Sequence, residues 1–518
     1  MGDTDFVPAE LPDWYVPVSE RATQHARRLL GESEPGVTNY RGTLMLHRSH
    51  LPLVERTTAG HSPAGSISWP SAITPRPWQL EAATWASERA GGIVALAPRM
   101  GKTALPFALQ TPSPTDQLLI VAPLALREVW RSWAERFYPD IPFYAVDGHS
   151  YDPEAKNAPI IFCHYDVLQF WMGAFANRPA LGVFDEPHVL ASYKAERTQT
   201  CKMVQAMCRR RLVLTGTPMW NRPRELHNVL QVATGTAFGH NFKDYGTRYC
   251  DPKPGKYAID YSGASNIEEL RARLAEVIYA RDWEDVGLPP RINRKIITVK
   301  IDEVMTDKLD AELVNLRSGE KDTTTVGDLA RYRKLLSRIK AQAVVDYVGG
   351  TREPIVIWAW HRQTVEWMAK EFSQITDAVF IHGGMTEPQR AKVLAAWQRP
   401  DGPPVMIATM PVAQVGLDMS RAKKAVNCEV DYVPITVAQA EMRTFDPYRE
   451  MDVTTFVADH IVDQRMTAAL AKKLDSARKV GLPAGTEAVS AIVDAADRDA
   501  PAEAPDMDAF ARALLEDL

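Results

Sequence analysis

The chain has 518 residues, of which 45% are hydrophobic and 24% are charged, and its formal net charge is -5. This length exceeds one ordinary hydrophobic core, so we expect two or three domains of a soluble globular protein. The five cysteines lack paired or zinc-like spacing, which indicates reduced thiols in a cytosolic compartment. No apolar stretch is long enough to span a membrane, and the charge excludes a globally basic chain but not a local basic groove.

The first 70 residues differ in composition from the rest of the chain. They are rich in proline, histidine and arginine, which favours a small accessory module or a partly ordered arm. From residue 71, short apolar runs alternate with longer amphipathic segments. The runs lie at 93–97, 118–122, 160–163, 181–184 and 212–214. Strands spaced by helices predict a doubly wound parallel sheet, hence an α/β lobe over 71–290 with a helical insertion from about residue 235.

The same alternation returns in the second half of the chain. Apolar runs at 355–360, 378–381, 405–408 and 424–428 predict a second, similar α/β lobe. We assign linker helices and this lobe to 291–480. The basic stretch 331–340 has an apolar face, so we interpret its charges as the solvated side of an amphipathic helix. Residues 481–518 have the composition of an acidic flexible tail.

A candidate phosphate-binding loop follows the first apolar run. Residues 98–103 are Pro-Arg-Met-Gly-Lys-Thr, and a helix-like segment follows them. A strand, a tight loop and a helix form the layout in which backbone N–H groups hold phosphates. We expect Lys102 to reach the β- and γ-phosphates of ATP and Thr103 to complete a Mg²⁺ shell, although a Gly-Lys-Thr helix cap arising by chance is the alternative. The nucleotide-binding residues expected in this loop are Arg99, Met100, Gly101, Lys102 and Thr103.

Adjacent carboxylates follow a later apolar run. Val183 and Phe184 lead directly into Asp185 and Glu186, and His188 comes two residues later. An Asp-Glu pair after a strand is often only a solvated strand end, but here it lies downstream of the phosphate-binding loop. We therefore expect Asp185 to hold Mg²⁺, directly or through water, and Glu186 to polarise the water that attacks the γ-phosphate.

These motifs, in this order, resemble those of superfamily 2 helicase-like ATPases, and specifically the Snf-type double-stranded DNA translocases. The similarity runs from about Pro75 to Arg465. The resemblance implies an α/β fold of two tandem RecA-like lobes with helical insertions between them, and it implies ATP and Mg²⁺ as cofactors. The stretch 245–270 also resembles the annealing-helicase branch, whose members remodel forked DNA.

The resemblance implies further roles in the first lobe. Gln79 lies in a segment similar to the family's adenine-reading motif, so it would hydrogen-bond the base edge. Pro123 stands at a strand end that would touch the DNA backbone. His188 would link the ATP site to a Leu-Thr-Gly-Thr-Pro string, in which Thr215 and Thr217 would relay the nucleotide state to the other lobe.

In the second lobe, three segments resemble family motifs that meet DNA or nucleotide. The turn that would contact DNA comprises Trp360, His361 and Arg362. Gly383 and Arg390 fit the next motif and are further candidates for nucleic-acid contact. Gly416 and Asp418 belong to a glycine-rich turn that would meet both the DNA backbone and the nucleotide.

The last motif supplies two candidate catalytic residues, Gln439 and Arg443, which would face ATP from across the cleft between the lobes. An arginine from the opposite lobe would stabilise transition-state charge and make hydrolysis depend on closure. The family usually has a second arginine three residues later, where this chain has Asp446. Arg449 substitutes for it, or one arginine suffices, or hydrolysis is weak. Arg99 is a second departure, because helicase-type loops usually carry glycine there.

The expected function is an ATP-dependent translocase on duplex or forked DNA, held mainly by backbone contacts that salt weakens. Two alternatives remain: a helicase that separates strands of DNA or RNA, and an ATP-gated clamp in which Arg99 and Asp446 disable hydrolysis. We expect no membrane partner, a monomer in the free state, and a protein partner as an option for the N-terminal arm or acidic tail. The expected location is the cytoplasm of a bacterial or phage-infected cell, or the nucleus of a eukaryote.

Overall fold

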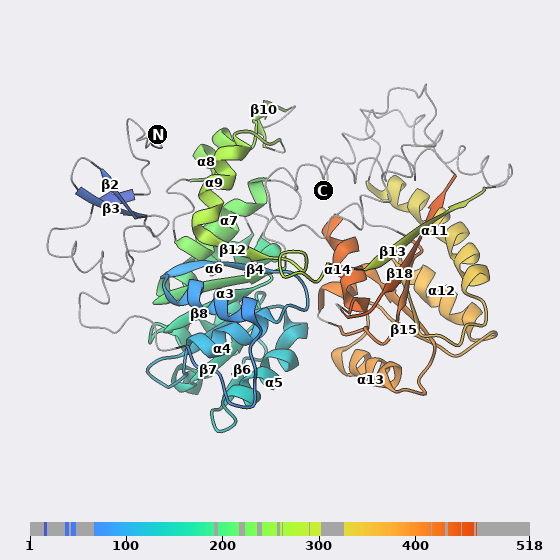
Figure 1. Ribbon diagram of the computed structural model, residues 1–518, viewed down its shortest axis with the longest axis horizontal. Helices are drawn as coiled ribbons and strands as arrows, with labels where there is room; N and C mark the ends of the chain where they lie inside the picture. Colours follow the sequence, from blue (N-terminus) through green and yellow to red (C-terminus); the bar gives the residue numbers. More distant parts are fainter. Residues whose placement is uncertain are drawn as a thin grey trace. The chain divides into compact units, whose positions relative to one another are not determined.

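The structure is a computed structural model of the chain. It describes residues 15–17, 37–40, 43–47, 67–190, 195–216, 223–235, 241–255, 259–261, 263–289, 291–301, 326–415, 417–429, 434–446, 448–459 and 463. The chain divides into two compact units, with the boundary between Asp282 and Trp283. Figure 1 draws the first unit in blue to green and the second in yellow to red.

The first unit is built on a seven-stranded sheet whose paired strands all run parallel. In spatial order the strands are β12 (Ile278–Arg281), β4 (Gly91–Leu96), β9 (Arg210–Thr215), β8 (Leu181–Asp185), β5 (Leu118–Val121), β7 (Ile160–Cys163) and β6 (Phe143–Ala145). The five strands expected from apolar runs are confirmed. The sequence did not indicate β6 and β12, which form the two edges and lack long buried runs.

Helices cover both faces of this sheet, as two adjacent glycines demonstrate. A Cβ atom at Gly91 would collide with the carbonyl oxygen of Ala233, in α7 (Pro223–Thr234). A Cβ atom at Gly92 would lie 2.6 Å from the ring of Trp85, in α3 (Pro77–Ser87). Successive strand residues point to opposite faces, so α7 and α3 approach β4 from opposite sides, and two-sided cover explains why these strands are apolar throughout.

The remaining helices of the first unit connect its strands or form its insertion. They are α4 (Leu105–Leu109), α5 (Arg127–Phe137), α6 (Glu196–Met207), α8 (Phe242–Tyr249) and α9 (Ile267–Val277). Figure 1 shows α8 and α9 close together beside α7. The strands β10 (Lys253–Pro254) and β11 (Ile259–Asp260) form a short antiparallel hairpin between α8 and α9.

The second unit has a six-stranded sheet, again with parallel pairing throughout. Its spatial order is β13 (Ile292–Val299), β18 (Met451–Ala458), β17 (Lys424–Asn427), β14 (Ile355–Ala359), β16 (Val405–Thr409) and β15 (Ala378–Ile381). The four strands expected from apolar runs are confirmed. Its helices are α11 (Val326–Val348), α12 (Arg362–Phe372), α13 (Glu387–Gln398) and α14 (Pro434–Thr444).

Two sequence-based expectations for the segment before β14 need correction. Linker helices were expected from residue 291, but β13 is an edge strand whose alternating, half-exposed residues give a weak signal. In α11, the expectation of solvated charges is wrong for Lys340, which is buried and pairs with Asp463 at 2.9 Å. Arg338 of the same helix is exposed, as expected, and lies over the ring of Trp367.

Outside the two large sheets, β1 (Tyr15–Pro17), β2 (Val37–Tyr40) and β3 (Thr43–His47) form a small antiparallel sheet in the order β1-β3-β2. This sheet lies within the segment that the sequence assigns to an accessory module or arm. Among the helices that the structure describes, none combines the length and apolar character needed to cross a membrane.

Candidate functional site

The candidate phosphate-binding loop connects β4 to a 3₁₀ turn over Lys102–Ala104 and then to α4. Two side chains of α3 donate hydrogen bonds to backbone carbonyl groups of this loop. Trp78 Nε1 donates to the carbonyl oxygen of Met100 at 3.0 Å, and Gln79 Nε2 donates to that of Gly101 at 3.0 Å. Gly101 has φ +85°, and a Cβ atom there would lie 2.5 Å from Gln79 Nε2, so this position requires glycine.

The backbone at Arg99 has a left-handed conformation, which glycine adopts without strain. Its φ is +70°, in the left-handed region, where a non-glycine residue costs about 1–2 kcal/mol. The departure from the family pattern at Arg99 therefore places a non-glycine residue in a backbone conformation that favours glycine.

Gln79 is buried and its amide is already engaged within the first unit. Its Oε1 accepts the N–H of Arg76 at 2.8 Å, while its Nε2 holds the Gly101 carbonyl. The structure thus places Gln79 against the phosphate-binding loop. Contact with an adenine edge stays a prediction, which the second amide hydrogen and the second lone pair of this side chain permit.

Asp185 ends β8 as a buried carboxylate with few partners. Trp130 Nε1 donates to its Oδ2 at 3.2 Å, whereas Oδ1 is buried and has no hydrogen-bond partner among the described groups. Burial raises the pKa of Asp185 to about 7, although the charge of Lys102 opposes this shift; the charge of Glu186 adds to it. A buried carboxylate with an unused oxygen fits a hard cation such as Mg²⁺.

Glu186 lies beside the phosphate-binding loop in a strained conformation. Lys102 Nζ is 2.8 Å from Glu186 Oε1, and Thr215 Oγ1 donates to Glu186 Oε2 at 3.4 Å. The φ of Glu186 is +47°, and its N–H donates to the carbonyl oxygen of Leu214 at 2.9 Å. Such strain often marks a functional position. The structure therefore brings together Lys102, Asp185, Glu186 and Thr215, and their catalytic roles stay predictions.

Within the described part of the chain, no cluster of three His, Cys, Asp or Glu residues is arranged to cage a metal. Mg²⁺ is usually held by one or two protein oxygens together with substrate phosphates. Asp185 and the Thr103 hydroxyl are the protein groups that would hold it. Thr217, Gly416 and the side chain of His188 lie outside the described residues, so their predicted roles stay predictions.

The first candidate turn for nucleic-acid contact begins where β5 ends. Pro123 precedes a 3₁₀ turn over Leu124–Leu126, and α5 starts immediately after it. Pro123 therefore stands at the carboxyl end of a central strand, next to the strand that carries Asp185.

The corresponding turn of the second unit follows β14 and is held by a residue that sequence reasoning missed. Glu429 Oε2 accepts the N–H groups of Trp360 and His361 at 2.9 and 3.1 Å, and Glu429 Oε1 lies 2.7 Å from His361 Nδ1. Burial alone would raise the pKa of Glu429, but the bonds and charge of His361 and the charge of Lys340 bring the pKa down to about 2. A glutamate just after an apolar strand was the available signal.

Arg362 begins α12 beside the turn that follows β15. Its Nε donates to Glu366 at 2.7 Å, and His382 Nε2 lies 3.4 Å from the same carboxylate. Gly383 is exposed and Arg390, in α13, is partly exposed. The structure thus brings Arg362 close to the segment around Gly383.

The two candidate catalytic residues of the second unit lie on α14. Gln439 is buried, and its Oε1 has no hydrogen-bond partner among the described groups. The carbonyl oxygen of Arg443 accepts the N–H of Met419 at 3.0 Å, which ties α14 to the turn that contains Asp418. Their predicted position facing ATP from the other lobe stays a prediction.

Arg449, one candidate for the missing second arginine, is engaged inside the second unit. Its Nε donates to Asp446 Oδ2 at 2.7 Å, and its Nη2 donates to the carbonyl oxygen of Ser420 at 2.5 Å. The residue that replaces the usual arginine therefore binds the next arginine along the chain.

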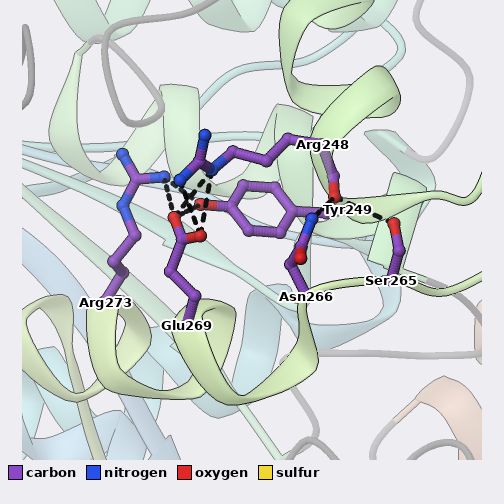
Figure 2. Close-up of polar contacts among 6 residues, drawn as sticks. All are labelled: Arg248, Tyr249, Ser265, Asn266, Glu269 and Arg273. Atoms are coloured by element: carbon purple, nitrogen blue, oxygen red, sulfur yellow. Dashed lines mark hydrogen bonds and ion pairs between the residues drawn. The ribbon is translucent and has the colours of Figure 1, made fainter.

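The stretch that resembles the annealing-helicase branch forms a polar brace between α8 and α9 (Figure 2). Arg248 donates to both oxygens of Glu269, and Tyr249 donates to Glu269 Oε1 at 2.7 Å. Arg273 contacts the hydroxyl of Tyr249 and lies over its ring. The carbonyl oxygen of Arg248 accepts from Ser265 and Asn266. These side chains bind one another, so the spacing of this stretch has a structural explanation.

Two family models match adjoining parts of this chain. The model of the SNF2-related domain matches residues 55–338, and that of the helicase conserved C-terminal domain matches 339–446. Among curated proteins, the SWI/SNF-related matrix-associated actin-dependent regulator of chromatin subfamily A-like protein 1 of Drosophila melanogaster is 26% identical over 402 residues, covering 74% of this chain and 52% of that protein. The human DNA annealing helicase and endonuclease ZRANB3 is 24% identical over 383 residues, covering 69% and 35%.

Among solved structures, the Sulfolobus solfataricus SWI2/SNF2 ATPase core in complex with dsDNA matches with a TM-score of 0.38 and 15% identity, covering 84% of this chain and 96% of that one. The chain spans about half the length of the Drosophila relative and about a third of the human one. Since the SNF2-related domain model covers more than half of the 518 residues, this chain belongs to the SNF2-related family of helicase-like ATPases.

Proposed function

We propose that this chain is an ATP-dependent translocase that moves along duplex or branched DNA. The observation that carries the proposal is the arrangement at the end of β8. A buried carboxylate oxygen of Asp185 lacks a partner among the described groups, and Glu186 pairs with Lys102 of the phosphate-binding loop. The family assignment gives this arrangement its ATPase context.

In this proposal Lys102 changes partner when nucleotide binds. Its Nζ now neutralises Glu186 at 2.8 Å. Phosphate oxygens would compete for the ammonium group, which frees Glu186 to polarise the attacking water. Asp185 and Thr103 would hold Mg²⁺, which supplies positive charge to the phosphates when bound. Thr215, already within reach of Glu186, would sense which partner Glu186 has.

The proposed DNA contacts come from turns at the ends of strands in both units. They are Pro123 in the first unit and Trp360, His361, Arg362, Gly383 and Arg390 in the second. Such contacts would be made mainly to phosphates, so binding should tolerate any sequence and weaken with salt. The relative named as a DNA annealing helicase favours branched DNA as the substrate, in repair, replication or recombination.

Arg443 would complete the site by stabilising transition-state charge, with Gln439 beside it on α14. The pairing of Arg449 with Asp446 supports a single catalytic arginine. The proposal therefore does not need the second arginine that other family members carry.

The test is ATP hydrolysis by the purified chain with no nucleic acid, single-stranded DNA, blunt duplex, forked DNA or structured RNA. A Glu186→Gln variant is the matched control, because it keeps the size of the side chain. Strong stimulation by duplex or fork, absent in the control, is expected. Stimulation by RNA or single strands alone, or none by any nucleic acid, would contradict the proposal, and a strand-displacement assay distinguishes translocation from unwinding.

A further inference from the structure

Asp185 is held by two residues that lie outside the phosphate-binding loop. Trp130 Nε1, from α5, donates to its side-chain Oδ2 at 3.2 Å. The Tyr165 hydroxyl, from the turn after β7, donates to its backbone carbonyl at 2.9 Å. All three residues are buried. One bond fixes the backbone at the end of β8 and the other fixes the carboxylate.

The hydrogen bond from Trp130 determines which oxygen of Asp185 is left to bind a metal ion. Because Oδ2 accepts the indole N–H, the rotation of the carboxylate is set. Oδ1 is then the oxygen left without a hydrogen-bond partner among the described groups. Trp130 itself is fixed by burial and by its ring contact with Phe107 of α4, whose centroid lies 5.8 Å away.

Burial alone does not force this hydrogen bond. The indole N–H groups of Trp69, Trp358 and Trp397 are also buried, and within the described residues they have no hydrogen-bond partner. This chain therefore accommodates indole N–H groups without an acceptor, although buried tryptophans usually find one. The orientation of Trp130 toward Asp185 is thus a specific feature of this site.

We propose that Trp130 is a positioning residue for the magnesium ligand Asp185, holding Oδ2 so that Oδ1 faces the cation. This inference rests on the proposed ATPase function. Replacing a residue that orients a metal ligand typically lowers metal affinity by about 10–100-fold. For Trp130 we expect a loss of roughly tenfold.

The variant Trp130→Phe removes the N–H donor and keeps an aromatic ring. Binding of a fluorescent ADP analogue to the full chain would be measured with Mg²⁺ and, separately, with EDTA. We expect affinity with Mg²⁺ to fall about tenfold and affinity in EDTA to stay within about twofold. Trp133→Phe is the matched control on the same helix, because Trp133 contacts Phe137 and Arg136 and should affect neither measurement.

A double-mutant cycle separates positioning from packing. Asp185→Asn alone should remove most of the Mg²⁺ dependence, and adding Trp130→Phe should then have no further effect. Equal losses with Mg²⁺ and with EDTA would show that Trp130 only packs, and no loss would also overturn the proposal. If the unaltered chain binds no Mg²⁺-dependent nucleotide, the proposed function fails together with the inference.

A second readout does not require the Trp130 variant to fold. In chain labelled with ¹⁵N-tryptophan, one indole N–H resonance should move on Asp185→Asn and on addition of Mg²⁺ and ADP. If no indole resonance responds to Asp185→Asn, the hydrogen bond does not exist in solution and the proposal is wrong.

Discussion

Each unit of this chain carries a buried carboxylate at or just beyond the end of a parallel strand, and the two have opposite surroundings. Asp185 ends β8 and is 2% exposed, while Glu429 lies two residues beyond β17 and is 4% exposed. The pKa of Asp185 is raised to about 7, whereas that of Glu429 is lowered to about 2. Because the two carboxylates are buried to a similar extent, the opposite pKa shifts must come from the groups that contact each carboxylate.

The partners explain the two shifts. Glu429 accepts two backbone N–H groups and pairs with the His361 ring, so its own unit satisfies its charge. The Asp185 Oδ2 accepts from the Trp130 side chain, Oδ1 has no hydrogen-bond partner among the described groups, and the nearby ammonium of Lys102 already pairs with Glu186. A carboxylate satisfied by its own fold has a structural role, whereas one short of partners is suited to receive a cation.

Two lysines that pair with carboxylates follow the same contrast. Lys102 and Glu186 are 2.8 Å apart with side chains 16% and 10% exposed, so the pair keeps some contact with solvent. Lys340 and Asp463 are 2.9 Å apart with both side chains 4% exposed, and Asp463 also accepts the N–H of Ala458 at 2.7 Å. The first pair is partly exposed, and the second is sealed inside its unit.

We expect the largest effects from replacing these two lysines, one on ATP turnover and the other on stability. Lys102→Ala should abolish ATP turnover while leaving the chain folded, because it removes the phosphate-binding charge. Lys340→Ala should instead destabilise the second unit by about 3–5 kcal/mol, because it leaves the Asp463 charge buried without its partner. Turnover and denaturant unfolding would be measured on both, and normal turnover in Lys102→Ala would refute the site.

The next effect concerns the two arginines of the second unit. Arg443→Ala should slow hydrolysis by about 10³-fold without weakening nucleotide binding, as loss of an arginine finger does. Arg449→Ala removes a bond to Asp446 and should reduce the rate by less than about tenfold if its role is structural. Single-turnover hydrolysis and nucleotide affinity check both, and the reverse ranking would make Arg449 the catalytic arginine.

Glu429→Ala should act on stability and on DNA binding together. Loss of this buried, hydrogen-bonded charge should cost about 3 kcal/mol at pH 7 and weaken duplex binding, because the turn at Trp360 loses its anchor. A lowered pKa stabilises the fold above the ordinary value of 4.5 and ceases to do so as the pH falls toward 2. Unfolding from pH 7 to 4 should show the difference from wild type shrinking below pH 4.5, and a constant difference would contradict the assignment.

Sequence patterns predicted the parts of the site that are local. Buried parallel strands are continuous apolar runs, so β4, β5, β7, β8 and β9 were visible, and the loop residues next to β4 and the acids at β8 followed from them. Edge strands such as β6, β12 and β13 are short or half-exposed and give no such run.

The missed features depend on residues far apart in the chain. Trp130 lies 55 positions from Asp185, Glu429 lies 68 from His361, and Lys340 lies 123 from Asp463. Each partner looks like an ordinary helix or strand residue in its own segment. Only the folded chain shows that Lys340 is buried rather than solvated.

The most direct test of the contrast is the stability of Asp185→Asn beside Glu429→Gln at pH 8, with and without Mg²⁺ and ADP. The raised pKa means that the ionised Asp185 destabilises the free chain above about pH 7 and ceases to do so as the pH falls toward 3.8. Asp185→Asn should therefore stabilise the free chain by about 2 kcal/mol at pH 8, and it should lose the further stabilisation by Mg²⁺ and ADP.

Glu429→Gln should do the opposite, lowering stability while keeping the Mg²⁺-dependent stabilisation. If Asp185→Asn instead destabilises the free chain and still responds fully to Mg²⁺ and ADP, then Asp185 is a structural residue like Glu429 and the account is wrong.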